Sequence, residues 1–206
     1  MSRASAERVE TRLFSPDFVF ATLANFFYSF GSQTLVATLP VYVLHLGGSE
    51  ADAGLVAGTL AFTALLLRPL VGWLTDVWNR RPLVLVGTVC YGVASVVYLV
   101  AASVPALVLG RVVHGVGLAN YTTAASAYLA DIAPPARRGE AIGFFSAAQG
   151  LGLITGPAIG FIVISTFGFP QLFYLITALA VVATVVSLFA KERRSAPARR
   201  PRWTLR

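Results

Sequence analysis

Six long apolar runs, separated by short polar breaks, dominate this sequence. Each run has about 20 or more mainly apolar residues, which is enough for a helix to cross a hydrocarbon core about 30 Å thick. The runs occupy roughly residues 18–46, 53–74, 83–102, 106–130, 141–167 and 172–190. Nearly every connection between them carries Pro, Gly or charged residues. The sequence therefore predicts an all-α membrane protein with six transmembrane helices joined as hairpins.

The composition excludes a soluble globule and several kinds of chemistry. Of the 206 residues, 56% are hydrophobic and 12% are charged, with a mean hydropathy of +0.73. Soluble domains carry about 25% charged residues. A single Cys cannot form an internal disulfide, and no Cys/His cluster or His pair at metal-ligand spacing occurs. We therefore expect no cofactor, no metal and no covalent chemistry, and we do not expect an enzyme.

The basic residues indicate how the chain lies in the membrane. All but two of the 16 Lys and Arg residues lie before the first run or after the second, fourth and sixth runs. The loops after the first, third and fifth runs contain none. Because basic loops stay on the cytoplasmic side, both termini are predicted to be cytoplasmic. The two exceptions, Arg68 and Arg111, lie inside runs.

The chain accordingly divides into three predicted segments. Residues 1–16 form a cytoplasmic N-terminal segment, residues 17–190 the six-helix transmembrane domain, and residues 191–206 a basic cytoplasmic tail. The first run is too long for a signal-peptide core, so no cleaved targeting segment is expected. The tail is interpreted as an anchor at anionic lipid rather than an arm for nucleic acid. Abundant Arg, Ala, Gly and Val with a single Lys suit a GC-rich bacterial genome, so we expect a multi-pass protein of a bacterial cell membrane.

A faint internal repeat is present. Pro69 and Gly72 in the second run have the same spacing as Pro157 and Gly160 in the fifth, and the offset between the two pairs is 88 residues. Transporter folds are often built from inverted repeats. If each copy crosses the membrane three times, the second copy has the opposite orientation to the first. The alternative is chance, because the same short pattern is common in membrane helices.

The turn between the second and third runs carries charges at defined spacing. Asp76 closes one helix and Arg80 and Arg81 open the next, so Asp76 and Arg80 can form a charge-assisted pair at the membrane face. A simple positive-inside anchor is the alternative. With Gly72, these residues resemble the signature loop of the major facilitator superfamily. Two positions depart from it: Val77 stands where the family usually has a basic residue, and Asn79 where it usually has Gly.

The connection between the fourth and fifth runs extends this resemblance. Asp131 is followed by Arg137, Arg138 and a glycine, as in the family. The resemblance implies that Asp131 and Arg138 join Asp76 and Arg80 in a cytoplasmic charge cluster. Such a cluster holds one face of a carrier shut and breaks when that face opens.

Arg111 lies several residues inside the fourth run, where an unpaired charge costs about 2.5 to 3.5 kcal/mol on insertion scales. The spacing places Arg111, His114 and Gly115 on one helical face, an arrangement similar to the family's fourth-helix Arg and Gly pattern. We expect Arg111 to face the bundle interior or water, with snorkelling to an interface as the alternative. His114 is interpreted either as a packed, hydrogen-bonded side chain or as part of a proton path.

Glycines four residues apart form a smooth face on the fifth run. Gly152, Gly156 and Gly160 allow close approach of another helix, and Pro157 bends the helix and frees a carbonyl. General small-residue packing explains this face without transport. The arrangement also looks like the fifth-helix motif of the family's efflux exchangers, so the resemblance favours export over uptake.

Polar side chains inside the runs are the candidates for a substrate cavity. The resemblance implies a cavity lined chiefly by the first, fourth and fifth helices, but helix-to-helix hydrogen bonding uses the same side chains. No Asp or Glu lies deep within a run, so proton coupling needs His114, an end carboxylate or residues outside this chain. The candidates are Asn25, Tyr28, Gln33, Arg111, His114, Asn120 and Gln149.

The resemblance covers nearly all of residues 17–190 and corresponds to the N-terminal half of a transporter. The family builds its cavity between two six-helix halves that rock against each other. A truncated or split gene, a half that pairs with a separate chain, and a homodimer all fit. In a homodimer, the glycine face of residues 152–160 and Asp76 would need partners from the second subunit.

Our primary hypothesis is an efflux carrier, or its N-terminal half, that moves a small organic solute such as a drug or sugar by alternating access. Proton coupling, substrate and direction stay open. The alternative is a membrane interaction protein that does not transport, keeps the bundle and binds a partner through its tail or surface.

Overall fold

The computed structural model describes residues 13–190 as an all-α bundle. Most of the predicted N-terminal segment and the whole predicted basic tail lie outside these described residues. Six long helices fill the described part, with one short 3-10 turn and no strand among them. They are α2 (Pro16–His45), α3 (Glu50–Val77), α4 (Arg80–Val100), α5 (Val104–Ile132), α6 (Arg138–Phe167) and α7 (Phe169–Phe189), and the turn is η1 (Pro135–Arg137).

Local sequence signals set several helix ends. The Ser15 hydroxyl accepts a hydrogen bond from the Phe18 N–H at 3.3 Å, and Pro16 occupies the first turn of α2. Ser49 and Asp52 form a reciprocal capping box at the start of α3. Gly168 has φ +92, which an L side chain adopts only with strain, and it allows α7 to begin directly after α6 ends.

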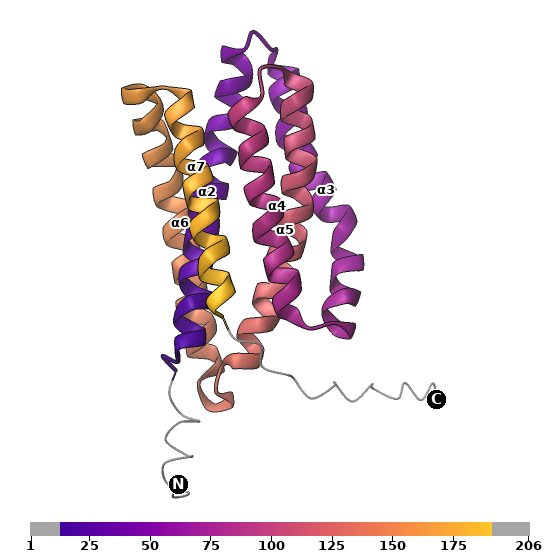
Figure 1. Cartoon of the computed structure of the whole chain (residues 1–206), viewed down its shortest axis with the longest axis vertical. Coiled ribbons are helices and arrows are strands. Elements are labelled where there is room, and N and C mark those ends of the chain that lie inside the picture. Colours follow the sequence, from indigo (N-terminus) through magenta and orange to yellow (C-terminus); the bar gives the residue numbers. More distant parts are fainter. Residues whose placement is uncertain (1–12, 191–206) are drawn as a thin grey trace, which may run out of the picture.

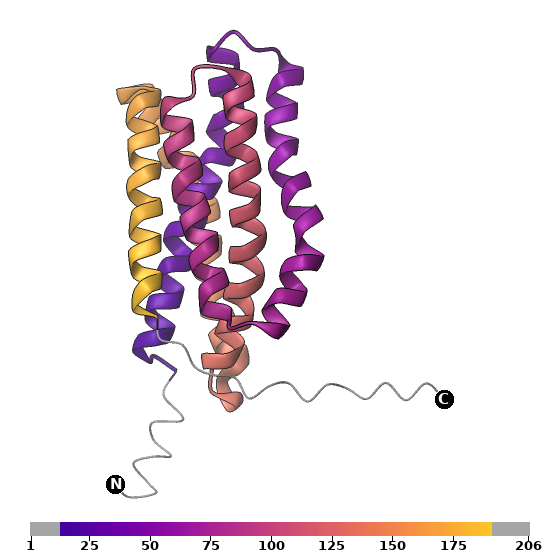
Figure 2. The ribbon, with the colours of Figure 1, turned by 45° about the vertical axis from the view of Figure 1, so that its right-hand side comes forward.

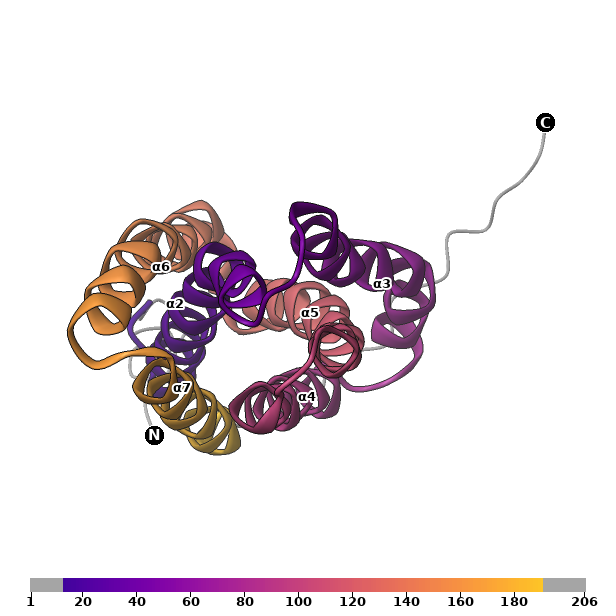
Figure 3. The same ribbon diagram turned by 90° about the horizontal axis from the view of Figure 1, so that it is seen from above.

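The bundle has two interior helices and four peripheral ones. Seen from above, α2 and α5 lie in the middle, with α6 and α7 beside α2 and with α3 and α4 beside α5 (Figure 3). A further contact, between α4 and α7, closes one side of the bundle. The hydrophobic core follows this arrangement, because its fully buried members come mainly from the faces that α2, α4, α5 and α7 turn toward one another.

Four parts of the bundle are long and apolar enough to cross a membrane by length and composition: α3, α4, the segment Pro135–Phe167 and α7. The two interior helices, α2 and α5, are not among them. They have 30 and 29 residues, so they are long enough, but their buried faces are polar. The buried polar side chains on these two helices are Asn25, Ser29, Ser32, Thr34, Thr38, Arg111, His114 and Asn120.

The two ends of the described chain lie at the same end of the bundle (Figure 1). The α3–α4 turn and the α5–α6 connection lie at that end too, as the 45° turned view also shows (Figure 2). This end carries Arg80, Arg81, Arg137 and Arg138, whereas the three described connections at the opposite end contain no Lys or Arg. We call these the basic end and the opposite end of the bundle.

Candidate functional site

An ion pair joins α4 to α5 at the basic end. Arg80 Nε lies 3.0 Å from Asp131 Oδ2, and both side chains are about one-fifth exposed. The expected pair between Arg80 and Asp76 does not form: among the described residues Asp76 has no ion pair, and it lies exposed in the last turn of α3. The reason is the extended backbone of Trp78 and Asn79, which ends α3 before α4 begins.

The other predicted residues at the basic end have separate surroundings. Arg81 Nη2 donates a hydrogen bond to the Leu188 carbonyl oxygen at 2.8 Å and so satisfies the C-terminal end of α7. Arg137 binds Glu140, three residues away, through two contacts of 2.7 and 2.8 Å. Arg138 is exposed, and a Cβ on Gly72 would meet nothing within 4 Å. The structure therefore brings together Arg80 and Asp131, but not the full predicted cluster.

The glycine face of α6 is occupied by α2 of the same chain. A Cβ on Gly152 would lie 2.7 Å from the Phe30 backbone nitrogen, and one on Gly156 would lie 2.7 Å from the Phe30 carbonyl oxygen. The Thr34 hydroxyl is 3.0 Å from the Gly156 carbonyl oxygen, to which it donates. The expectation that this face needs a partner from a second subunit was therefore wrong, because α2 already fills it.

Pro157 lies within α6, on the turn between Gly156 and Gly160. A Cβ on Gly160 would lie 2.7 Å from the Thr34 methyl group and 3.0 Å from the Thr38 methyl group. The close approach of α2 thus continues past the proline over about two helical turns of α6.

Arg111 is the largest fully buried side chain in the described chain, with 1% exposure. Its Nη2 donates to the Leu35 carbonyl oxygen at 3.2 Å, and its guanidinium lies 5.9 Å from the centre of the Tyr98 ring. Nε and Nη1 of Arg111 are buried without a hydrogen-bond partner among the described residues. A buried guanidinium with two free donors on the bundle interior is suited to receive an anionic or hydrogen-bond-accepting group.

His114 lies one helical turn from Arg111 and is fully buried. Its Nε2 is 3.3 Å from the Ser32 hydroxyl of α2, and its Nδ1 is 3.5 Å from the Tyr98 hydroxyl of α4. His114 therefore connects three helices through its ring nitrogens. This geometry agrees with the packed, hydrogen-bonded interpretation of His114.

Aromatic rings continue this polar interior toward the basic end. The Tyr28 ring stacks on Tyr121 with centres 3.9 Å apart, and its centre is 5.0 Å from that of Tyr91. The Tyr91 ring in turn lies 5.0 Å from His114. The hydroxyl oxygens of Tyr28 and Tyr91 are buried without a hydrogen-bond partner among the described residues. The bundle interior therefore carries two unsatisfied tyrosine hydroxyls beside the hydrogen-bonded His114.

The remaining cavity candidates differ in burial. Asn25 donates from its side-chain amide to the Phe145 carbonyl oxygen of α6 at 2.9 Å, which ties two helices together. Asn120 donates to the Val116 carbonyl oxygen within its own helix, also at 2.9 Å. Gln33 is half-buried and Gln149 is exposed.

The contribution of α4 to the site was not predicted from the sequence. In α4, four buried polar side chains recur at helical spacing: Thr88, Tyr91, Ser95 and Tyr98. Two of these, Tyr91 and Tyr98, contact His114 or Arg111. Their spacing of three, four and three residues was the available signal, since it places all four on one face of a helix.

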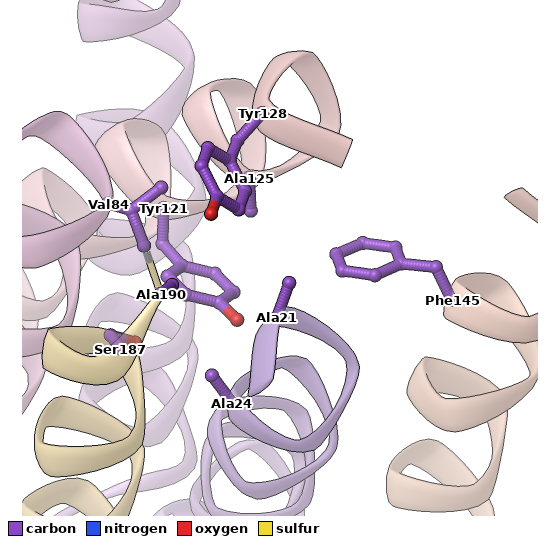
Figure 4. Close-up of a pocket in the computed structure, with 9 residues that line it drawn as sticks. All are labelled: Ala21, Ala24, Val84, Tyr121, Ala125, Tyr128, Phe145, Ser187 and Ala190. Carbon is purple, nitrogen blue, oxygen red and sulfur yellow. The ribbon is translucent and has the colours of Figure 1, made fainter. Parts of the chain in front are cut away.

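A small cavity lies below the tyrosine stack, toward the basic end. It measures about 20 Å³, which is room for a single water molecule. Figure 4 shows the Tyr121 and Tyr128 side chains directed into it, facing Ala21 and Ala24 of α2, with Phe145 at its edge. The described residues contain no group of three or more His, Cys, Asp or Glu that could hold a metal ion.

Long apolar helices around an interior that carries a cation, an imidazole and tyrosine hydroxyls are typical of multi-pass membrane transporters. Residues 21–205 match the sequence pattern of the Major Facilitator Superfamily, and the chain belongs to that family.

Its relatives include an uncharacterised major-facilitator-type transporter of Methanocaldococcus jannaschii (29% identical over 170 residues, 82% of this chain and 44% of the relative). Multidrug resistance protein 2 of Bacillus subtilis is 29% identical (81% of this chain, 42% of the relative), and the quinolone resistance protein NorA of Staphylococcus aureus is 28% identical (82% and 44%).

Solved transporters share this fold. A peptide transporter of the POT type, crystallised with sulfate, superimposes with a TM-score of 0.78 at 19% identity, over 86% of this chain and 39% of the transporter. The same type of transporter in complex with alafosfalin gives a TM-score of 0.75. The chain thus spans less than half the length of the relatives it matches, and it has the fold of one part of a larger transporter.

Proposed function

We propose that this chain is an efflux carrier, or the N-terminal half of one, that moves a small organic solute across the membrane by alternating access. The observation that carries the proposal is Arg111, a fully buried guanidinium with two free donors and no carboxylate partner among the described residues. Such a charge is costly to place in a membrane protein, so it is retained where a substrate or pathway uses it. The drug-resistance relatives support an organic solute and the outward direction.

We further propose that all six helices span the membrane and that the basic end faces the cytoplasm of a bacterial cell. Length supports spanning by α2 and α5, since 30 and 29 residues reach about 45 Å. Their buried polar side chains face the bundle interior. The orientation rests on the positive-inside rule, with Arg80, Arg81, Arg137 and Arg138 at one end.

We propose that the bundle is an inverted repeat of α2–α4 and α5–α7. The helix lengths support this, because they run 30, 28 and 21 residues and then 29, 30 and 21. In this repeat α2 corresponds to α5, α3 to α6 and α4 to α7. The helix contacts follow the same correspondence, because the α2–α6 contact matches the α5–α3 contact, and the α2–α7 contact matches the α5–α4 contact. Pro69 and Pro157 each occupy the twentieth position of their helix.

We propose that the complete carrier contains a second six-helix half, supplied by another copy of this chain or by a separate chain. The chain covers 44% of its relatives, which supports a missing half, and a truncated gene product also fits that length. Two faces are available for such a partner. In α3, Cβ atoms on Gly54 and Gly58 would meet nothing within 4 Å, and in α6 the same holds for Gly139, Gly143 and Gly150.

The ion pair of Arg80 and Asp131 is proposed as part of the latch that holds the cytoplasmic face shut. It links the start of α4 to the end of α5, so a shift of these helices stretches it. Asp76 and Arg138 are exposed and form no ion pair among the described residues, a Cβ on Gly72 would meet nothing within 4 Å, and these three residues are proposed to engage the second half. Proton coupling would use His114 or an end carboxylate, since no described Asp or Glu lies in the bundle interior.

The test is solute flux in vesicles reconstituted with the purified chain. Arg111→Ala is expected to lower flux about tenfold or more, because hydrogen bonds to a charged group contribute about 1.5 to 3 kcal/mol. The matched control is Arg68→Ala, which removes the other guanidinium inside an apolar run, one that is exposed and forms no ion pair among the described residues. Unchanged flux in the Arg111 variant, with normal insertion, would contradict the assignment.

A membrane interaction protein that does not transport is the second candidate, and the open glycine faces of α3 and α6 support it. It keeps the bundle and uses the free faces of α3 and α6, or the tail, to bind a partner. Absence of flux from well-inserted chain, with or without a pH gradient, would support it against the carrier.

A further inference from the structure

A second cavity lies at the opposite end of the bundle, away from Arg80 and Asp131. It measures about 360 Å³, within the range of small-molecule sites. Its walls come from three helices: the end of α2, the end of α4, and the corner at which α7 begins. We call it the aromatic pocket, and it is lined chiefly by Tyr42, His45, Leu99, Phe169 and Phe173.

The rings of the aromatic pocket are arranged as adjoining walls. The centre of the Tyr42 ring is 4.8 Å from that of Phe169 and 4.9 Å from that of Phe173, and the Tyr42 and Phe173 planes are 73° apart. His45 completes the group, with its ring centre 4.9 Å from Phe169. A group placed against these walls lies within the roughly 6 Å over which a ring attracts a cation.

The geometry of these rings is fixed by the chain around them. The Tyr42 hydroxyl donates to the Ala101 carbonyl oxygen at 3.0 Å, so the α4–α5 connection holds that ring. Gly168, at φ +92, donates its N–H to the carbonyl oxygens of Val163 and Ile164 and sets the sharp corner before Phe169. Phe173 is buried at 2% exposure. The pocket is thus formed in advance of any ligand.

The charges around the pocket favour a cation over an anion. No Lys or Arg is among the lining residues. Helices α2 and α4 both end here, so the negative ends of two helix dipoles face this end, while the Val43, Leu44 and Ala101 carbonyl oxygens already accept hydrogen bonds from the chain. Helix α7 begins here, but Pro170 in its first turn has no N–H, and the Gly168 N–H is already used.

We propose that the aromatic pocket binds an alkylammonium group, carried by a small organic cation in solution or by an aminolipid headgroup. The cation sits against the half-buried rings of Tyr42 and Phe169, which Phe173 supports from behind, and its apolar part contacts Leu99 and Leu46. The site is separate from the Arg111 interior and is independent of transport by the chain.

The test is equilibrium binding of benzyltrimethylammonium to the full chain, purified in an uncharged detergent. Tyr42→Leu and Phe169→Leu, which keep apolar volume and remove a ring, should each weaken binding about 5- to 30-fold. Tyr42→Phe keeps the ring and should change the affinity by less than about twofold. The matched control is Phe167→Leu, the same substitution on an exposed residue of the same corner that does not line the pocket.

Two further experiments test whether the ligand must be charged and whether it comes from solution or from a lipid. Benzyl alcohol has the ring without the charge and should not displace the probe. In nanodiscs, competition by phosphatidylcholine over phosphatidylglycerol would assign the pocket to a lipid headgroup, and its absence would assign it to a dissolved cation.

Absence of saturable binding, displacement by benzyl alcohol, or equal weakening in the Phe167 control would each overturn the proposal. If Tyr42→Leu fails to fold, as judged by circular dichroism and elution volume, the comparison of Phe169→Leu with Phe167→Leu still decides. No flux is needed for this measurement, so a failure of the proposed transport function would leave its outcome unchanged.

Discussion

At the scale of single residues, the glycines of α6 serve two different purposes. Gly152, Gly156 and Gly160 receive the backbone and threonines of α2, whereas Gly150 lies where an added Cβ would meet nothing within 4 Å. Small residues allow helices in membranes to approach closely, and van der Waals packing then holds them together. The sequence spacing does not distinguish the two sets, because it does not state which neighbour lies on which face.

Gly156→Ala should destabilise the bundle. The new Cβ would lie 2.7 Å from the Phe30 carbonyl oxygen, a backbone atom that cannot turn aside, so α2 and α6 must separate. Overpacking of this kind costs about 1 to 3 kcal/mol. Thermal unfolding of the detergent-purified chain measures the effect.

Gly150→Ala is the matched control for this prediction. It adds the same methyl group to the same helix in open space and should leave the unfolding temperature unchanged or raise it, since Ala favours a helix over Gly by up to about 1 kcal/mol. Equal unfolding temperatures for the two variants would show that the α2–α6 contact does not limit stability.

Arg111 and His114 show which features of the site the sequence predicts and which it does not. The position of Arg111 inside an apolar run predicted an interior guanidinium, and burial at 1% exposure confirms that geometry. The partners of Arg111 and His114 could not be predicted in the same way, because the Leu35 carbonyl, Tyr98 and Ser32 come from helices whose rotation about their own axes is set only by packing. The functional role of Arg111 stays a prediction.

At the scale of elements, the connection between α3 and α4 decides which charges meet. The residues Asp76 and Arg80 are close in sequence, and this predicted their pairing. The extended backbone of Trp78 and Asn79 separates them, and Arg80 instead contacts Asp131 from α5. Sequence spacing predicts contacts within one helix well, but a turn between two helices is governed by a few dihedral angles that spacing does not report.

Neutralising Asp131 should therefore weaken this end of the bundle more than neutralising Asp76. Asp131→Asn removes a charge that lies 3.0 Å from Arg80 Nε, whereas Asp76→Asn removes an exposed charge without an ion pair among the described residues. Both side chains of the pair are partly exposed, so water screens their attraction. The expected loss in the free energy of unfolding is therefore about 0.5 to 1 kcal/mol.

The measurement is a double-mutant cycle in thermal unfolding, with Asp131→Asn and Arg80→Gln alone and together. Coupling of the two sites would support the ion pair as a stabilising contact. A larger effect from Asp76→Asn would instead mean that Asp76 is the more important carboxylate of this end.

At the scale of the whole molecule, the six apolar runs predicted the six helices closely, but hydropathy alone does not separate interior from peripheral helices. Helices α2 and α5 carry the polar faces that form the core of the site, and these faces lower their apolar character. The same property makes them hard to identify as membrane-crossing segments by composition. Their interior position follows only from the packing of α3, α4, α6 and α7 around them.

The free faces of α3 and α6 lead to a prediction about assembly. The chain spans 44% of the length of its relatives. Both helices expose large apolar side chains, among them Phe62, Leu65, Leu151 and Ile154. Lipid covers such side chains without cost, so their exposure alone requires no partner. The glycines beside them, at which nothing lies within 4 Å, do provide room for a second helix to approach closely.

If another copy supplies the second half, the particle in nanodiscs should contain protein of twice the 21.9 kDa of one chain, as measured by light scattering. Gly143→Leu would fill the open face of α6 and should shift the particle to one chain per disc. The matched control is Gly92→Leu on α4, where a Cβ also meets nothing within 4 Å but which lies on a different helix.

A dimer that carries flux, and loses both mass and flux in the Gly143 variant, would establish a carrier built from two copies. A single chain per disc without flux would contradict the homodimer and leave a fragment, a separate partner chain or the interaction protein as the explanation, because a six-helix half has no opposing half against which to rock.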